Sequence, residues 1–318
     1  MSVLFTSNHG LGRDENLRAV WDAYDGPKEF VLGVKNAIGG RGHSVVVCDT
    51  LMPRDPRKGY VSVNIGHGIT GGKLYGLDEQ RAGIDPVALA QTDYVISTGT
   101  AMREVAAGSF GIPVERALPL GMPRTDWYVG RHKGDGGTLM AGYRRAYLYA
   151  PTFRGPNDGA RLPSIDWSLI DRMLADDEVL VVKRHCFTRD GLVNRRCSHI
   201  VEVPHSEPSA GYLIDCDVLV TDYSSILFDA YVLGKPSVLL VDDADAYLRT
   251  RGMYFDYPTW YCSRSLRVER NEVEFMRTLR DAADAGMGEV ERNCVGTVAD
   301  MCDGGSSRRV ADLIRSLA

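Results

Sequence analysis

The sequence contains no CxxC pair, and its seven cysteines are scattered along 318 residues. An odd number of widely spaced cysteines argues against a disulfide scaffold and is typical of reduced thiols in a cytoplasmic protein. Cys186 follows His185, but no second pair at zinc-ligand spacing accompanies them. We therefore expect no structural metal site. Nor does any cluster of carboxylates mark a dedicated site for magnesium.

The sequence also lacks any apolar run approaching the roughly 20 residues that a membrane-spanning helix needs. Its first residues, MSVLFTSNHG, are too polar after Phe5 for a signal peptide. We therefore expect a cytoplasmic protein, peripheral at most at the inner face of the cell membrane. Lys and Arg number 37 against 42 Asp and Glu, giving a net charge of −5. With no basic stripe carrying interleaved aromatic residues, this charge argues against a nucleic-acid partner.

What the sequence does contain is a repeated alternation of short apolar runs with helical patterns. Such alternation is typical of doubly wound parallel sheets, and the length suits two domains. A basic, Gly-rich stretch at 128–145 predicts the linker between a first domain at 1–135 and a second at 136–318. We predict strands at residues 2–6, 29–34, 44–48, 61–65, 94–97, 117–120, 146–150, 179–182, 200–203, 218–220 and 237–241.

In the second half, polar and cationic segments follow three of the predicted strands. These segments are PTFR at 151–154, KRH at 183–185 and DYSS at 222–225. Ligands bind at the carboxyl edge of open α/β sheets. Ser224 and Ser225 can be simple caps of the next helix, or they can hold a phosphate at its N-terminus. Because three such segments share one edge, the binding interpretation is favoured.

In the first half, His67 lies in GHGITGG directly after a predicted strand. A histidine between glycines at a strand end is a candidate general base, or an ordinary turn residue. Arg124 follows a proline in the loop GMPRTD, where it can grip a phosphate or lie at the surface of a domain hinge. Asn16 precedes a helical pattern, and we predict that it caps that helix.

These motifs together resemble the CDP-glycerol glycerophosphotransferase family, which includes teichoic acid polymerases and primases. The similarity extends along nearly the whole chain. The first half shows NLRAVWDAY, GHGIT, YVISTG and GMPRTD, and the second shows YAPTFR, VVKRH, LVTDYSSILFDAYVLGKPSVLL, RGMYFDY and DGGSSRRVADLI. TDYSS followed by FD and a Lys-Pro turn is the most specific of these motifs.

The resemblance implies an α/β, GT-B-like architecture, with two Rossmann-like domains facing a cleft. The first would be the acceptor-side domain and the second the CDP-donor-binding domain, with the last helix packing back on the first. The implied enzyme moves a polyol phosphate from CDP-glycerol or CDP-ribitol to an acceptor hydroxyl and releases CMP. The implied acceptor is a polyol phosphate or glycan of a cell-wall, capsule or related polymer, including a lipid-linked one.

For such an enzyme our mechanistic hypothesis is direct phosphoryl transfer, and it assigns roles to three of the matched residues. His67 would be the general base for the acceptor hydroxyl, and His185 could act as the acid beside the departing CMP. Asp229 would accept a hydrogen bond from a glycerol or ribose hydroxyl, or support the serine loop. Taken from the strand ends and the matched motifs together, the expected donor-binding set is Gly68, Ile69, Thr70, Gly71, Arg124, Pro151, Thr152, Arg154, Lys183, Arg184, Asp222, Ser224, Ser225 and Asp229.

Two other functions stay open on the sequence. One is a GT-B glycosyltransferase that uses a nucleotide sugar, and the other is a catalytically silent nucleotide-binding module. The chain departs from the family where GHGITGG replaces the more usual HGTPLK and where Thr125 replaces an asparagine. No cofactor is certain, although the pyrophosphate of the donor could bring Mg²⁺ with it.

Overall fold

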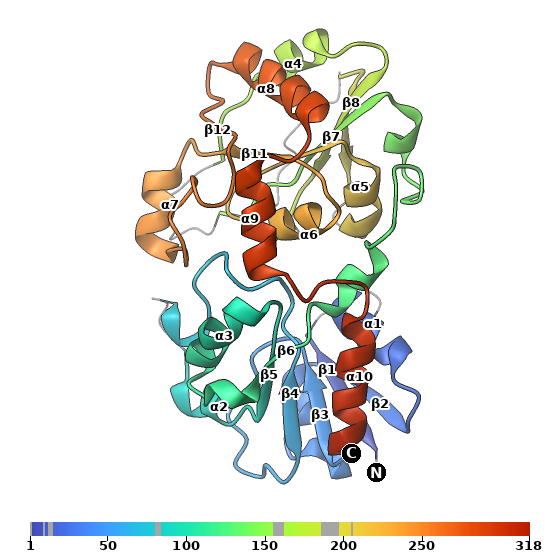
Figure 1. Cartoon of the computed structure of the whole chain (residues 1–318), viewed down its shortest axis with the longest axis vertical. Helices are drawn as coiled ribbons and strands as arrows, with labels where there is room; N and C mark the ends of the chain where they lie inside the picture. Colours follow the sequence, from blue (N-terminus) through green and yellow to red (C-terminus); the bar gives the residue numbers. More distant parts are fainter. Residues whose placement is uncertain are drawn as a thin grey trace. The chain divides into compact units, whose positions relative to one another are not determined.

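The computed structural model of the chain describes residues 2–8, 10–11, 15–79, 84–154, 162–185, 197–204 and 206–318. The chain forms two compact units: unit 1 is Met1–Val129 with Gly296–Ala318, and unit 2 is Gly130–Val295. The division lies a few residues before the expected boundary at 135. Each unit contains a six-stranded parallel sheet covered by helices (Figure 1). The predicted α/β class with two doubly wound sheets is confirmed.

The sheet of unit 1 has the order β2-β1-β3-β4-β5-β6. The chain goes outward from β1 to β2, then crosses back and runs outward from β3 to β6. The two directions therefore separate between β1 and β3, at a topological switch point. Its strands are β1 Val3–Ser7, β2 Lys28–Leu32, β3 Val45–Cys48, β4 Val61–Asn64, β5 Tyr94–Ser97 and β6 Ala117–Pro119.

Successive side chains of the central strands of unit 1 enter two different clusters, as a pleated strand with two buried faces requires. The helices of this unit are α1 Glu15–Ala23, α2 Pro86–Ala90, α3 Arg103–Phe110 and α10 Ser306–Leu317. On one face, α1 and α10 pack on the sheet through Leu17, Val20, Val310 and Ile314, against Val3, Phe5, Val45 and Val47. Leu4 and Val46 belong to the opposite cluster.

The C-terminal helix α10 is held in unit 1 by polar contacts as well as by its apolar face. It packs beside α1 (Figure 1), and the carboxylate of Asp126 caps its N-terminus. The Asp126 oxygens accept from the amides of Ser306 and Ser307 at 3.0 and 2.7 Å. A carboxylate is favoured there because the first amides of a helix carry partial positive charge. Asp126 belongs to GMPRTD, so this loop anchors α10.

Unit 2 has the sheet order β12-β11-β10-β7-β8-β9, with the chain directions separating between β7 and β10. Its strands are β7 Arg145–Tyr149, β8 Glu178–Lys183, β9 Ile200–Val203, β10 Val218–Thr221, β11 Ser237–Leu240 and β12 Ser265–Leu266. Its helices are α4 Trp167–Met173, α5 Ser209–Asp215, α6 Ile226–Val232, α7 Ala244–Arg251, α8 Glu272–Ala285 and α9 Glu289–Val298, whose last residues fall in unit 1. Among the described residues, no helix combines the length and apolar composition that a bilayer crossing requires.

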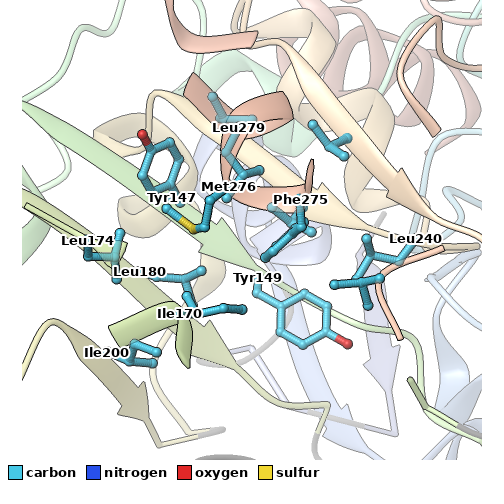
Figure 2. Packing of buried hydrophobic residues seen from close by; sticks show 14 of the residues in the cluster. Tyr147, Tyr149, Ile170, Leu174, Leu180, Ile200, Leu240, Phe275, Met276 and Leu279 are labelled. Atoms are coloured by element: carbon cyan, nitrogen blue, oxygen red, sulfur yellow. The ribbon is translucent and has the colours of Figure 1, made fainter. Parts of the chain in front are cut away.

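One face of the unit 2 sheet carries large apolar side chains beneath α4 and α8 (Figure 2). Phe275, Met276 and Leu279 of α8 pack on Tyr147 and Leu240 of the strands. These side chains are at most 2% exposed, and each fully buried one contributes roughly 1.5–3 kcal/mol to folding. The opposite face packs against α5 and α6. The sheet is therefore buried on both faces. A ligand can contact the loops at the ends of its strands.

The described cysteines are all free thiols, five of them buried. Cys186 lies outside the described residues. Burial raises the pKa of the Cys48, Cys216 and Cys262 thiols to about 12. These thiols are therefore protonated at neutral pH and behave as small apolar side chains.

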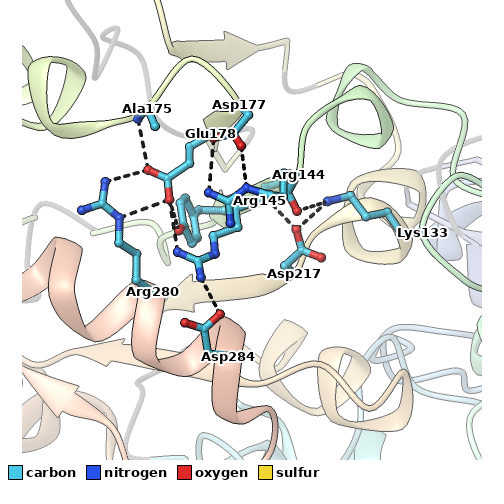
Figure 3. Close-up of polar contacts among 11 residues, drawn as sticks. Lys133, Arg144, Arg145, Ala175, Asp177, Glu178, Asp217, Arg280 and Asp284 are labelled. Atoms are coloured by element: carbon cyan, nitrogen blue, oxygen red, sulfur yellow. Dashed lines mark hydrogen bonds and ion pairs between the residues drawn. The ribbon is translucent and has the colours of Figure 1, made fainter.

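A buried carboxylate, Glu178 at the start of β8, joins α8 to the sheet (Figure 3). It accepts from Arg280 Nε and Nη2 at 3.1 and 2.7 Å, from the Tyr147 hydroxyl at 3.0 Å and from the Ala175 amide at 3.1 Å. Its side chain is 1% exposed. Burial opposes its ionisation, but these donors outweigh burial and lower the pKa of Glu178 to about 2.

We expect this carboxylate to make unfolding depend on pH. Its folded pKa lies below the unfolded value of about 4.5, so the stabilisation is fully present above about pH 4.5. It is lost as the pH falls toward 2, by on the order of 3 kcal/mol in total. Glu178→Gln should lower the unfolding free energy at pH 7 by about 2–3 kcal/mol and should flatten this acid dependence.

The measurement is urea unfolding followed by circular dichroism between pH 2.5 and 7. Glu274→Gln is a matched control. Glu274 lies at the surface of α8, the helix that Glu178 binds through Arg280, and it pairs with Arg277 at 2.9 Å. This substitution should change stability by less than about 0.5 kcal/mol. Equal effects of the two substitutions would show that Glu178 does not join α8 to the sheet.

Candidate functional site

His67 lies in the loop after β4 of unit 1, and its imidazole is held in one orientation. Its Nδ1 lies 3.2 Å from the backbone carbonyl oxygen of Asp49, which follows β3 directly. A carbonyl oxygen can only accept a hydrogen bond, so Nδ1 is the donor in this contact, and in the neutral imidazole Nε2 is then the basic nitrogen. The His67 side chain is exposed, and the ring of Tyr75 meets it edge-on at 6.1 Å between centroids. This arrangement is suited to a general base that acts through Nε2.

Arg124 lies beside His67, in the loop after β6. Its Nη1 donates to the backbone carbonyl of His67 at 2.6 Å, and its backbone amide donates to Asn16 Oδ1 at 3.0 Å. Its side chain is half-buried. The structure therefore brings together the two first-half residues that the sequence singles out. The predicted cap is wrong: α1 begins at Glu15, and Asn16 lies inside it.

The residues after His67 divide into two kinds. Gly68 and Thr70 are half-buried, whereas Ile69 is 3% exposed and contributes to the interior. Gly71 has φ +112°, and a Cβ on it would lie 2.7 Å from Cγ1 of Val298. Glycine is required there by backbone conformation and by packing against the C-terminal segment. Ile69 and Gly71 thus build the loop, while Gly68 and Thr70 lie nearer its surface.

In unit 2, the three segments that the sequence predicts as a binding site follow neighbouring strands. β10, β7 and β8 are adjacent and parallel, so residues 222–225, 151–154 and 183–185 leave the sheet at one edge. The Thr152 amide donates to Asp222 Oδ1 at 2.8 Å. The Phe153 ring stacks on His185, with centroids 6.0 Å apart and an interplanar angle of 29°. The structure therefore brings the three segments into contact.

Arg154 is buried among these segments, with a side chain 8% exposed. Its Nη2 donates to Asp222 Oδ2 at 2.8 Å, its Nε to Asp243 Oδ2 at 2.7 Å and its Nη1 to the Thr152 carbonyl at 2.7 Å. Asp243 also accepts from the Tyr223 hydroxyl at 2.8 Å. Burial opposes the charge of Arg154, but the two carboxylates outweigh it and raise its pKa above the ordinary value. Arg154 and Asp222 therefore bind each other and are buried, whereas the sequence predicted that both would contact the donor.

The basic segment begins with Lys183, the last residue of β8, and its three residues differ in exposure. Lys183 is 6% exposed, and its Nζ lies 3.4 Å from the Pro204 carbonyl. Arg184 is half-buried and forms an ion pair with Glu202 of β9. His185 is exposed. Lys183 and Arg184 therefore have protein partners along the sheet, and His185 is the most accessible member of the segment.

Ser224 and Ser225 lie just before α6, and both are half-buried. Ser224 Oγ accepts from the Ile226 amide across a long 3.4 Å. Ser225 occupies the cap position, yet its side chain does not cap α6, whose residues are all described. Helix capping is therefore a weak explanation for the paired serines. Asp229 lies on the buried side of α6 and is 2% exposed.

Two residues at these edges were not predicted from the sequence. Asp49 orients His67 through its carbonyl, and it could have been found because it directly follows a strand of the same sheet edge. Asp243 binds Arg154, which lies 89 positions earlier. No local pattern indicates that pair.

The chain is similar to enzymes of teichoic acid synthesis. It is 28% identical over 223 residues to the teichoic acid poly(ribitol-phosphate) polymerase of Bacillus spizizenii, covering 65% of this chain and 36% of that protein. It is 31% identical over 167 residues to the teichoic acid glycerol-phosphate primase of Bacillus subtilis, covering 52% and 44%. A ribitol-phosphate primase of Bacillus spizizenii is 26% identical over 236 residues, covering 70% and 59%. The chain thus spans about a third to six tenths of these relatives' length.

Solved structures agree on the fold. The wall teichoic acid polymerase TagF superposes with a TM-score of 0.78 at 19% identity, covering 99% of this chain and 88% of that one. A UDP-GlcNAc 2-epimerase from Neisseria meningitidis gives a TM-score of 0.61 at 10% identity, covering 99% and 100%. The chain therefore has the GT-B-like fold of two Rossmann-like units that the sequence resemblance implies.

The family itself is shown by a match along most of the sequence. The model of the CDP-Glycerol:Poly(glycerophosphate) glycerophosphotransferase family covers residues 44–316. This range contains the loops of His67 and Arg124 in unit 1 and all three loop segments of unit 2. The chain belongs to the CDP-glycerol:poly(glycerophosphate) glycerophosphotransferase family.

Proposed function

We propose that this chain transfers a polyol phosphate from a CDP-activated donor to a hydroxyl of a wall teichoic acid or related polymer, releasing CMP. Glycerol phosphate is the group that we expect it to carry. The main support is one observation. The sequence motifs that resemble the family lie in the loops that follow the parallel strands, at the carboxyl edge of each sheet. Relatives named as glycerol-phosphate and ribitol-phosphate enzymes support it, as does a TagF structure obtained after a soak with CDPG.

The proposed reaction is a direct phosphoryl transfer. The acceptor hydroxyl oxygen attacks the phosphorus that bears the polyol, and a new P–O bond forms as the bond to the bridging oxygen breaks. CMP leaves with that oxygen. His67 Nε2 takes the hydroxyl proton, and the Nδ1 hydrogen bond to Asp49 supports the resulting positive charge. Catalysis of this kind relies on positioning and on neutralising oxygens that gain charge.

Unit 2 supplies the donor-binding groups in this proposal. Ser224 and Ser225 donate hydroxyl hydrogen bonds to phosphate oxygens, and Arg184, Lys183 and His185 balance the charge of the departing CMP. Because Arg154 and Asp222 are buried against each other, we assign them to holding the Pro151–Thr152 segment in place. The burial of Asp229 favours support of the serine loop over direct contact with a hydroxyl.

Magnesium is the metal that a pyrophosphate donor would bring. Among the residues that the structure describes, no group of three or more His, Cys, Asp or Glu side chains could hold a metal ion. Bound to the donor, Mg²⁺ would neutralise phosphate charge. The roles assigned to His67 and to the paired serines are the same in either case.

The first test is a donor panel with the purified chain. CDP-glycerol, CDP-ribitol, UDP-N-acetylglucosamine and CMP-sialic acid are each incubated with polyol-phosphate and glycan acceptors, including lipid-linked ones. We expect CMP release from a CDP-polyol, with acceptor mass rising by one polyol phosphate per event. Release of UDP, or of CMP from the sialic acid donor alone, would indicate a sugar transferase. Donor binding by calorimetry with no turnover on any acceptor would indicate a silent binding module.

The role of His67 is tested by His67→Ala. Loss of the base should lower kcat for CMP release by about 10²–10⁴-fold, while the Kd for the CDP-polyol stays within about three-fold. His43→Ala is the control, because His43 lies in the same unit and its imidazole pairs with the surface residue Glu29, at 3.2 Å. Wild-type turnover in His67→Ala would show that His67 takes no part in the chemistry. A loss of donor affinity as large as the loss of kcat would show that His67 binds the donor instead.

The paired serines are tested by replacing both, Ser224→Ala with Ser225→Ala. Losing two neutral hydrogen bonds to phosphate should weaken donor binding by about ten- to hundred-fold. Because Ser224 caps α6 only across 3.4 Å, the melting temperature should hardly change. Ser168→Ala, on the exposed side of α4, is the control. Unchanged donor affinity, measured by calorimetry with CDP-glycerol, would exclude the serines from the donor site.

A further inference from the structure

Asn16 is a buried polar residue whose side chain hydrogen-bonds to two different loops. It lies in α1 and is 1% exposed. Its Nδ2 donates to the carbonyls of Ile65 and Gly66 at 3.1 and 2.7 Å. Its Oδ1 accepts from the Arg124 amide at 3.0 Å. Two carbonyls need the amide nitrogen and one backbone N–H needs the oxygen, so the partners fix the orientation of this carboxamide.

These partners surround His67. Ile65 and Gly66 immediately precede it, and Arg124 donates from Nη1 to the carbonyl of His67 itself at 2.6 Å. The contacts close a ring through Asn16, the His67 loop and Arg124. Asn64, the last residue of β4, also holds this loop, because its Oδ1 accepts from the Gly66 amide at 2.9 Å. The backbone around the histidine is therefore held by hydrogen bonds from the side chains of Asn16, Asn64 and Arg124.

This loop needs such ties because its own sequence does not define it. Gly66 has φ +63°, in the left-handed region that glycine adopts easily. A glycine-rich loop samples many conformations, and a catalytic group misplaced by about 1 Å can lose about 10²-fold in rate. A shift of the His67 backbone would also break the 3.2 Å contact between Nδ1 and the Asp49 carbonyl.

Apolar side chains attach α1 to the sheet. Leu17, Val20 and Tyr24 bury the helix against the sheet and α10. The helix therefore has an apolar attachment of its own, while the hydrogen bonds of the Asn16 side chain go to the two loops.

We propose that Asn16 is a positioning residue that fixes the backbone, and with it the imidazole orientation, of His67. The inference rests on the proposed function, in which His67 is the base. Asn16 touches neither donor nor acceptor in this proposal. It acts by presenting Nε2 of His67 to the attacking hydroxyl.

The test combines Asn16→Ala with His67→Ala in a double-mutant cycle, using CMP release from the CDP-polyol that the donor panel identifies. Asn16→Ala alone should lower kcat by about 10–10²-fold, with the donor KM within about three-fold. Combined with His67→Ala, it should lower the residual rate by less than about two-fold, because the group it positions is gone. An equal factor in both backgrounds would overturn the proposal and make Asn16 a purely structural residue.

Two controls separate positioning from stability. Asn36→Ala removes an exposed carboxamide that donates to the Leu32 carbonyl at 2.8 Å in the same unit, and it should leave kcat unchanged. If Asn16→Ala does not fold, Asn16→Ser takes its place. Serine is smaller than asparagine but still offers one hydrogen-bond donor, its hydroxyl. A partial loss of kcat is expected for Asn16→Ser, and wild-type kcat in that variant would overturn the proposal.

A second measurement does not need turnover. The ring ¹⁵N shifts of His67 should show the Nδ1–H tautomer in the unchanged chain and a mixture of tautomers in the Asn16 variant. Unchanged shifts in that variant would overturn the positioning role. If the unchanged chain releases no CMP from any CDP-polyol, the proposed function fails, while the shifts still decide whether Asn16 orients His67.

Discussion

All strand pairings in the two sheets are parallel, and this constraint determines where chemistry can take place. Parallel neighbours end at one edge, so the loops that follow them must meet there. Helices cover both faces of each sheet and leave the edges to the loops. In unit 1 this edge brings Asp49 beside His67. In unit 2 it brings the segments at 151–154, 183–185 and 222–225 into contact.

Edges made of glycine-rich and polar loops need internal support, and both units supply it with buried polar side chains. Asn16 in unit 1 and Arg154 in unit 2 are each nearly inaccessible, and each binds atoms from loops far apart in the sequence. A buried amide or guanidinium that lost such partners would carry a large desolvation penalty. The native loop geometry is therefore also the geometry in which these groups are satisfied. In both units, buried polar residues hold the loops that carry the exposed candidate residues.

The sequence predicted the strands well because their signals are local. Apolar runs of four to six residues between turn residues reach nearly the observed bounds, as in Tyr94–Ser97 and Ile200–Val203. The prediction for Asn16 was wrong because a capping rule considers the nearest residues, whereas its partners lie 49 and 108 positions away. Arg154 resembled a ligand-binding arginine for the same reason, since Asp243 is remote in the chain. Sequence patterns thus found the edge of each sheet, but they could not separate the residues that support it from those at its surface.

Fold likeness alone would leave the chemistry open, because the same architecture serves a UDP-GlcNAc 2-epimerase at a TM-score of 0.61. The distinguishing information lies in a few atoms at the edges. The Asp49 carbonyl, directly after β3, lies 3.2 Å from Nδ1 of His67, and the serine pair before α6 makes one long contact, of 3.4 Å, with its helix. The serine pair contributes little to the cap of α6, because both side chains are half-buried and only a 3.4 Å contact joins Ser224 to the helix. Hydroxyls that their helix hardly uses are available to a ligand, and in the proposed phosphoryl transfer that ligand is the donor phosphate.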